Sequence, residues 1–396
     1  MNDDLVMKKK NKNKLLTIII IVLSIAIISV GGVILYNHFN SNNKEEPKIE
    51  EPKEEEPQKE ESPIKIIDIN SKTRPYAVMI NCHNESLPQS GLQDAYIVYE
   101  IMVEYGITRM MALFKDVDMA KVGSVRSARN QYLGYVWEND AIYAHAGGSP
   151  EALERIKNEK IADIDVDGKY GVRDKELRKK RAYEHTLFTN STLLKQGIKD
   201  KGLRDTTDNG NLITYSADSI DLSKYQTQKA NKISIKYSSY RTSNYDYDAS
   251  KKVYLRSMGN KKNTDLVTGK QYEVKNVIAY AVKYTTYKDH GYNGYQKISN
   301  IGTGEGYYFT EGVALPITWE KKDEKSKTIY RVKETGEELV VNDGNTYIQI
   351  YPSNGGKLSI SWWFIEYKRS YYDGDKKLSF GIISITIYLF ILKKKK

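Results

Sequence analysis

Two arginines three residues apart are the clearest candidates for chemistry in the chain. Arg126 and Arg129 follow a Gly-Ser step in the segment KVGSVRSARNQYLGY, residues 121–135. If Ser124 caps a helix that begins here, both guanidinium groups lie on one helical face. The N-terminus of such a helix adds partial positive charge and free N–H groups, and guanidinium groups bind carboxylate or phosphate through paired hydrogen bonds. The pattern therefore predicts a corner that binds an anion.

A structural role for the same two arginines is the alternative interpretation. Glu100 and Glu104 precede them in the sequence, and an ion pair with either one would engage a guanidinium group inside the protein. Unpaired donors that converge would favour ligand binding, whereas paired arginines would favour the structural role.

A second anion corner is predicted at HAGGSPE, residues 145–151. His145 ends an apolar run, and Ser149 follows a Gly-Gly turn directly before a helical segment. Ligands of open α/β sheets gather at such carboxyl ends of strands. Ser149 is a poor nucleophile candidate because the segment lacks the final glycine of a G-x-S-x-G elbow. An ordinary helix cap at Ser149 and a buried strand residue at His145 are the structural alternatives.

His185 is the third candidate, in the segment RAYEHTLFTN beside Arg181 and Glu184. Cys82 and His83 are adjacent, so on an extended chain their side chains point apart and they cannot themselves form a catalytic dyad. The chain has one cysteine and five histidines, without a CxxC or HExxH pattern. No metal site and no cofactor are therefore predicted.

Alternating strand and helix patterns predict an α/β domain over residues 71–198. Apolar runs indicate strands at 76–80, 109–114 and 141–146. Helical spacing and capping signals predict helices at 92–106, 124–139 and 149–159. Short β-rich runs separated by Gly, Asn and Asp turns follow. They predict a second, β-rich domain over 232–360, with 199–231 as a connector.

An uncharged apolar stretch of 22 residues, 15–36, is long enough to cross a membrane as a helix. A cleaved signal peptide is the competing interpretation, but its apolar region would be shorter. Residues 1–14 carry five lysines, whereas residues 37–70 form a spacer rich in Glu, Pro and Lys. This charge asymmetry predicts a basic cytoplasmic tail at 1–14, a single-pass anchor in the cell membrane, and folded domains outside it.

Residues 361–396 form a tail that fits neither domain. The tail holds 15 uncharged residues, 378–392, before four lysines, which is short for a membrane span. A second membrane segment and a read-through end of the chain both stay open as interpretations. The lysine-rich ends hold nine lysines and account for most of the net charge of +10, so no nucleic-acid partner is predicted.

Several motifs together resemble the YerB-like lipoprotein family of Gram-positive bacteria. They are RPYAVMIN, PQSGLQDAYIVYEIMVEYGITRMMALF, VGSVRSAR, AIYAHAGGSPEAL and GEGYYFTEGVALPITWEK. The resemblance covers about residues 74–360. It implies an exported cell-envelope protein with an N-terminal α/β domain and a C-terminal β-rich domain, neither with an assigned function. It also places six candidate residues in the most distinctive segments of the family: Arg126, Ser127, Arg129, His145, Ser149 and His185.

The chain departs from the family in three ways. An apolar segment stands where many members carry a lipidated cysteine, Cys82 stands where the family usually has Asn, and EHTLFT replaces a PHNLYT-like segment while keeping His185. The Asn usual at position 82 argues against a catalytic thiol.

Two functions follow as hypotheses. The first is a membrane-anchored extracytoplasmic protein that binds an anionic ligand, a wall polymer or a wall-building partner through its α/β domain. The alternative is a hydrolase or transferase acting on wall material, with His145 or His185 as general base. Catalysis would require such a histidine within about 2.6–3.2 Å of a nucleophile or bound water, whereas binding requires only converging donors.

Overall fold

The computed structural model describes residues 64–287 and 294–361 and two short strands, β24 (Tyr372–Asp373) and β25 (Lys376–Lys377). They belong to one compact unit that spans Glu61–Lys396. The predicted tail 1–14, the membrane segment 15–36, residues 37–63 of the spacer and the apolar segment 378–392 lie outside the described residues. Among the helices that are described, none has the length and apolar character needed to span a membrane.

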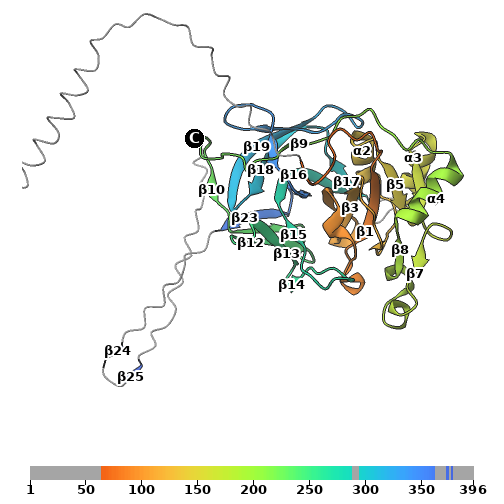
Figure 1. The fold of residues 1–396 in the computed structure, drawn as a ribbon, viewed down its shortest axis with the longest axis horizontal. Coiled ribbons are helices and arrows are strands. Elements are labelled where there is room, and N and C mark those ends of the chain that lie inside the picture. Colours follow the sequence, from red (N-terminus) through yellow and green to blue (C-terminus); the bar gives the residue numbers. More distant parts are fainter. Residues whose placement is uncertain (1–63, 288–293, 362–371, 374–375, 378–396) are drawn as a thin grey trace, which may run out of the picture. The chain divides into compact units, whose positions relative to one another are not determined.

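One large sheet contains strands from both predicted domains (Figure 1). Its N-terminal members are β1 (Tyr76–Asn81), β2 (Ile97–Met102), β3 (Thr108–Phe114), β5 (Ile142–His145) and β6 (Asp163–Asp165). Its C-terminal members are β10 (Gln228–Lys229), β16 (Asn276–Thr286), β17 (Gln296–Ser299), β18 (Gly302–Thr310), β19 (Val313–Lys321), β20 (Ile329–Val332) and β22 (Thr346–Pro352). The central order is β10-β19-β18-β16-β22-β2-β3-β1-β5-β6. The two halves meet where β2 and β22 pair in parallel, with Ile97 opposite Thr346.

A second sheet has the order β14-β13-β12-β11-β23, with β15 beside β13. Its strands are β11 (Lys232–Lys236), β12 (Thr242–Asp248), β13 (Val253–Met258), β14 (Lys261–Lys262), β15 (Glu273–Val274) and β23 (Lys357–Ser361). Besides the pair of β24 and β25, two small sheets complete the described unit. They are β4 (Val122–Gly123), β8 (Leu187–Thr189) and β7 (Val172–Arg173) in one, and β9 (Thr214–Ser216) with β21 (Val340–Asn342) in the other.

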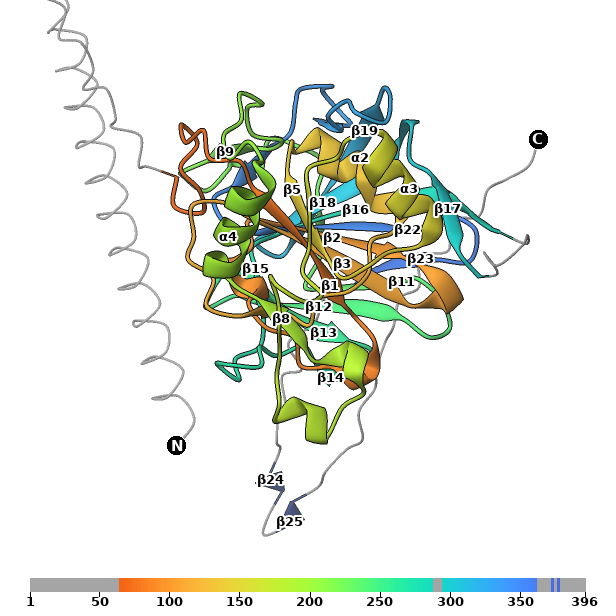
Figure 2. The same cartoon turned by 90° about the vertical axis from the view of Figure 1, so that its right-hand side faces the viewer.

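Three helices cover the N-terminal strands, and α2 and α3 lie on the side of β5 opposite to α4 (Figure 2). They are α2 (Asn130–Glu138), α3 (Pro150–Asn158) and α4 (Ser191–Lys201). Alternate residues of β1 enter different cores: Met79 packs with α2 and α3, whereas Val78 packs with α4 and the second sheet. This alternation is expected of a strand covered on both faces.

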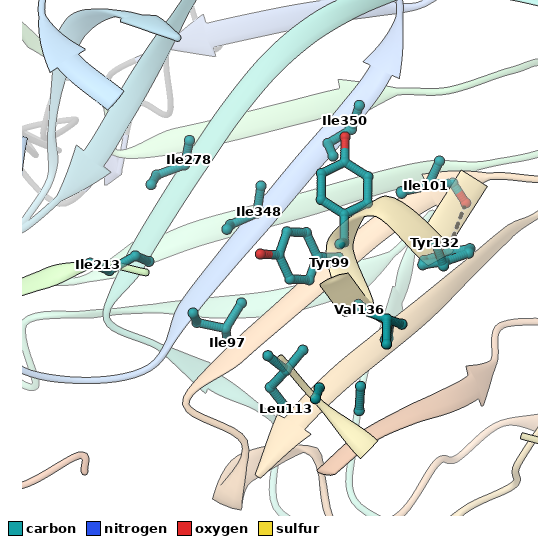
Figure 3. Packing of buried hydrophobic residues seen from close by; sticks show 14 of the residues in the cluster. Ile97, Tyr99, Ile101, Leu113, Tyr132, Val136, Ile213, Ile278, Ile348 and Ile350 are labelled. Carbon is teal, nitrogen blue, oxygen red and sulfur yellow. Dashed lines mark hydrogen bonds between the residues drawn. The ribbon is translucent and has the colours of Figure 1, made fainter. Parts of the chain in front are cut away.

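The core around α2 joins both halves of the chain (Figure 3). Tyr132 and Val136 of α2 pack with Ile101 of β2, with Ile350 of β22, and with Ile278 of β16. The apolar contacts thus cross from the segment before residue 204 to the segment after 232, and the two sets of strands share one core.

Several predicted elements are confirmed. Strands occur at 76–81, 108–114 and 142–145, the C-terminal region is rich in strands, and α3 begins with Ser149 as its cap and Pro150 at its first turn. The described fold as a whole is richer in β-structure than the predicted α/β domain implies.

The predicted helix at 92–106 is wrong. A short turn at Leu92–Asp94 leads into strand β2, which lies between β3 and β22. The apolar run of Ile, Val and Tyr is buried on both faces of the sheet, so it lacks a two-residue alternation and resembles a buried helix in sequence.

The predicted helix start at Ser124 is also wrong, because α2 begins at Asn130 with Arg129 at its N-cap position. Residues 124–128 run extended, and the N–H groups of Val125 and Arg126 donate to carbonyls of Leu187 and Met79. These hydrogen bonds to neighbouring strands satisfy backbone N–H groups that would bond within the segment if it were a helix.

Candidate functional site

The segment that carries the two arginines crosses the carboxyl ends of β1 and β5. The Arg126 N–H donates to Met79 O of β1 at 2.9 Å, and its carbonyl accepts from Ala146 N, just after β5, at 3.1 Å. Farther along, Ala128 N donates to Gly147 O at 2.9 Å. The segment thus lies at the edge where the sequence predicted a ligand corner, but as an extended chain.

Arg129 is engaged inside the protein. Its Nε donates to Glu104 Oε2 at 2.8 Å, and its Nη2 contacts Glu104 Oε1 as well. Arg109 Nη2 donates to the same carboxylate at 2.8 Å. Burial acts to raise the pKa of Glu104, but the hydrogen bond from Arg129 and the charges of both arginines outweigh it and lower the pKa to about 2. Glu104 is therefore the partner that the structural interpretation required, while Glu100 pairs with Arg256 instead.

Arg126 has a different environment. The side chain is half-buried, and its guanidinium group has no hydrogen bond or ion pair with any residue in the described ranges. Burial lowers the pKa of the Arg126 guanidinium, while the charge of Glu184 acts in the opposite direction. Backbone hydrogen bonds place the segment of Arg126 beside Met79 and Asn81 of β1, and Asn81 contacts His185. A backbone hydrogen bond lowers the pKa of Glu184 and burial lowers the pKa of His185, and the charge of Arg126 adds to both.

Asn81, the last residue of β1, connects this neighbourhood to His185. Its N–H donates to Ser124 O at 2.9 Å, and its Oδ1 accepts from His83 N at 3.0 Å. The amide Nδ2 then faces His185 Nδ1 at 2.9 Å. Because the amide donates, His185 Nδ1 accepts, and the proton of the neutral imidazole lies on Nε2. His185 is 3% exposed, and burial, with the charges of Arg126 and His83, lowers its pKa.

His83 and Glu85 face His185 from the turn η1 (Asn84–Ser86). The two imidazole rings are stacked with centroids 5.0 Å apart and planes at 7°. His185 Nε2 lies 3.7 Å from Glu85 Oε2. The turn η5 (Tyr183–His185) is held to this region by Arg181, whose guanidinium donates to Ser86 O and Leu87 O at 2.9 Å. Arg126, His83, Glu85, Glu184 and His185 together are called the Arg126–His185 site.

A metal ion fits this site poorly. One nitrogen of each histidine and one oxygen of Glu85 lie within 4.8 Å of one another, a separation from which a cation could draw them together. However, His83 Nδ1 accepts from Glu85 N at 3.3 Å and His185 Nδ1 accepts from Asn81. A neutral histidine whose Nδ1 accepts carries its proton on Nε2, where a metal would need a lone pair. The two imidazoles therefore present hydrogen-bond donors, which suit an anion.

The side chains of His145 and Ser149 and the carbonyl of Ser127 have other partners. His145 is buried, with Nδ1 2.9 Å from Gly147 O and Nε2 3.3 Å from Asp163 Oδ2. Ser149 Oγ accepts from Ala152 N at 3.3 Å as the cap of α3. Ser127 contributes its backbone carbonyl as an acceptor for Arg109. Within the described ranges no hydrogen bond joins any of the three to His185, although backbone hydrogen bonds join Ala146 to Arg126 and Gly147 to Ala128.

Among the described residues, no nucleophile is placed beside either candidate base. Within residues 64–287 and 294–361, no Ser, Thr, Cys or Lys side chain hydrogen-bonds to the ring of His145 or His185. Cys82 is buried, and burial together with the charge of Glu100 raises the pKa of its thiol to about 12. The described geometry offers hydrogen-bond donors rather than a nucleophile–base pair.

Sequence reasoning missed His83, Glu85 and Asn81. Because adjacent side chains on an extended chain point apart, His83 cannot pair with Cys82, and in the structure its ring stacks on His185 instead. The nearest sequence signal is the spacing His-x-Glu after a strand, which is too short to predict the contact with His185.

Comparisons with known proteins match most of the described chain. Residues 64–204 match the N-terminal domain, and residues 233–348 the C-terminal domain, of a family described as "Protein of unknown function (DUF3048)". A relative named "Putative lipoprotein YerB", from Bacillus subtilis (strain 168), is 27% identical over 288 residues, which cover 71% of this chain and 82% of the relative. The crystal structure of the YerB protein from Bacillus subtilis superposes with a TM-score of 0.63 and 25% identity, covering 76% of this chain and 99% of that one.

Proposed function

Since the chain belongs to the YerB-like family and carries both of its domains in order, we propose that it is an extracytoplasmic protein of the cell envelope that binds an anionic ligand at the Arg126–His185 site. The name of its relative as a lipoprotein supports export and membrane attachment. In this chain the apolar segment 15–36 would supply the attachment in place of a lipid.

The unpartnered guanidinium of Arg126 is the observation that carries the proposal. Arg109 and Arg129 share the carboxylate of Glu104, whereas Arg126 is half-buried and bonded to no described residue. A partly desolvated charge without a partner is unfavourable, and the binding of an anion would relieve it. The same group would supply a forked donor to phosphate or carboxylate.

The histidines extend the donor set. Nε2–H of His185 points away from Asn81, on the side where Glu85 approaches to 3.7 Å. Glu85 and Glu184 are exposed, so solvent screens their repulsion of an anion. Their carboxylates would also accept hydrogen bonds from hydroxyl groups of a ligand. An anionic ligand that carries hydroxyl groups, such as a wall polymer, therefore suits the site better than a simple ion.

Sedimentation with purified cell-wall sacculi tests the proposal. The full chain, purified in detergent, is compared with Arg126→Ala and with the matched variant Lys199→Ala, which removes one exposed positive charge from α4. We expect wild type and Lys199→Ala to sediment alike and Arg126→Ala to bind about 10-fold or more weakly, as for the loss of a charge-assisted hydrogen bond. Equal binding by all three proteins would contradict the proposal.

A further inference from the structure

A cavity rich in positive charge lies beside turn η1 and includes Asn84 of that turn. It has a volume of about 440 Å³ and extends from Asn84 to the end of β13 and to β14. Arg241, Lys261 and Lys262 line it, and no acidic residue belongs to its described lining. Lys261 and Lys262 are exposed and form no ion pair with the described residues. The field inside such a cavity favours an anion.

The buried arginine of this cavity has only neutral acceptors. Arg241 is 2% exposed, and its Nη2 donates to Cys82 O and, at 3.2 Å, to Asn84 Oδ1. Its Nε is buried and lacks a partner among the described residues. The nearby carboxylate of Glu100 is bonded to Arg256, Thr108 and Ser243 instead. A buried guanidinium group that pairs with no carboxylate destabilises a folded protein, and a bound anion would neutralise its charge.

The cavity and the Arg126–His185 site share one short segment of chain. His83 and Glu85 face His185, whereas Asn84, between them in sequence, lines the cavity and contacts Arg241. Neighbouring side chains of this segment thus belong to the cavity and to the Arg126–His185 site, so η1 connects the two.

We infer that the cavity of Arg241, Lys261 and Lys262 is a second anion subsite, and that the protein binds a polymer with repeating phosphate groups across both subsites. This inference rests on the proposed function and specifies its ligand class as a polyol-phosphate or sugar-phosphate chain. One phosphate lies against Arg126 and another enters the cavity, while the intervening hydroxyl groups pass Glu85 and Asn84. Two linked contacts bind a polymer more tightly than a monomer, by a factor on the order of 100.

Titration of the full chain in detergent with two probes tests the inference. The probes are glycerol 3-phosphate, a monomer, and a poly(glycerol phosphate) chain. The variants are Arg126→Ala and the double variant Lys261→Ala plus Lys262→Ala. The matched control is Lys195→Ala plus Lys199→Ala, which removes two exposed charges from α4. Arg241 is left intact because its loss could disturb folding.

The two subsites predict a distinct pattern. The Lys261/Lys262 variant should weaken polymer binding by about 10-fold or more and leave monomer binding at Arg126 unchanged. Arg126→Ala should weaken both, and the control neither. Polymer binding unchanged by the Lys261/Lys262 variant overturns the second subsite while leaving the proposed function standing. Monomer binding unchanged by Arg126→Ala overturns the proposed function and the inference with it. Binding of anionic phospholipid vesicles without binding of the polymer overturns the polymer as ligand.

Discussion

Asn81 Nδ2 lies 2.9 Å from His185 Nδ1, and this contact determines which nitrogen of the histidine keeps its proton. The amide is oriented by the hydrogen bond from His83 N to its Oδ1. Nε2–H of His185 is therefore a donor in the neutral ring, and its role in binding an anion does not depend on a positive charge.

Asn81→Asp should make anion binding depend on pH. A carboxylate accepts from Nδ1–H, so above the new pKa the ring would carry no proton on Nε2, and below it both nitrogens would donate. We expect sulfate binding by the wild type to stay nearly constant between about pH 6.5 and 8.5, since the pKa of His185 is already below its usual value of 6.5. In Asn81→Asp, binding should fall as pH rises through this range.

The control for this substitution is Asn190→Asp, which places a carboxylate at the N-cap of α4, where Asp is well tolerated. Sulfate titrations at a series of pH values, followed by calorimetry, provide the measurement. A flat profile for Asn81→Asp would show that His185 does not donate to the anion.

Glu104 should make the free energy of unfolding depend on pH in the acid range. Its folded pKa is about 2, below the usual 4.5, because the arginine contacts outweigh burial. A group with a lowered folded pKa stabilises the fold fully above its unfolded pKa, and that contribution is lost as pH falls from about 4.5 to 2. The contribution is on the order of 3 kcal/mol. In thermal melts the gap in stability between wild type and Glu104→Gln should narrow over this interval. A gap of constant size would contradict this prediction.

The buried pair of Glu100 and Arg256 should be sensitive to the loss of either partner. Both side chains are fully buried, with Arg256 Nη2 2.8 Å from Glu100 Oε2, and the two residues connect β2 to the second sheet. Glu100→Gln leaves a buried guanidinium without its counter-ion, so we expect a loss of about 3–5 kcal/mol in the free energy of unfolding.

The exposed pair of Lys333 and Glu305, at 2.7 Å, supplies the comparison for this experiment. Glu305→Gln should cost less than about 1 kcal/mol, because solvent screens exposed pairs. Denaturant titrations of both variants measure the difference. Similar losses would indicate that the Glu100–Arg256 pair adds no more than a surface contact does.

Cys82 should be inert in the folded protein. Its thiol is buried, and its pKa of about 12 leaves roughly one thiol in ten thousand ionised at pH 8. Iodoacetamide should therefore leave the native chain unmodified over hours while it alkylates the urea-unfolded chain within minutes, as read by intact mass. Rapid alkylation of the native chain would place the thiol at an accessible surface.

The elements that local patterns determine could be predicted from sequence, and the site largely could not. YAVMI forms a strand and Ser149-Pro150 begins a helix because each signal acts within a few residues. The contact of His83 with His185 joins residues about a hundred positions apart, and it depends on turns η1 and η5 meeting beyond β1. No local pattern encodes the contact between these two turns. Nor does a local pattern encode the pairing of β2 with β22, and without that pairing the sequence of β2 resembles a buried helix.

Arg126 and Arg129 should differ in their effect on stability, and this comparison separates a binding arginine from a structural one. Arg129 is 6% exposed and shares Glu104 with Arg109, so Arg129→Ala removes one of two counter-ions from a partly buried carboxylate. We expect it to lower the free energy of unfolding by about 2–4 kcal/mol. Arg126→Ala removes a half-buried charge without a described partner, and should change stability by less than about 0.5 kcal/mol or raise it. Denaturant unfolding of both variants measures the two values. A large loss in Arg126→Ala would mean that its guanidinium, like that of Arg129, holds the fold together, and the ligand would then have to be sought at the cavity beside Arg241.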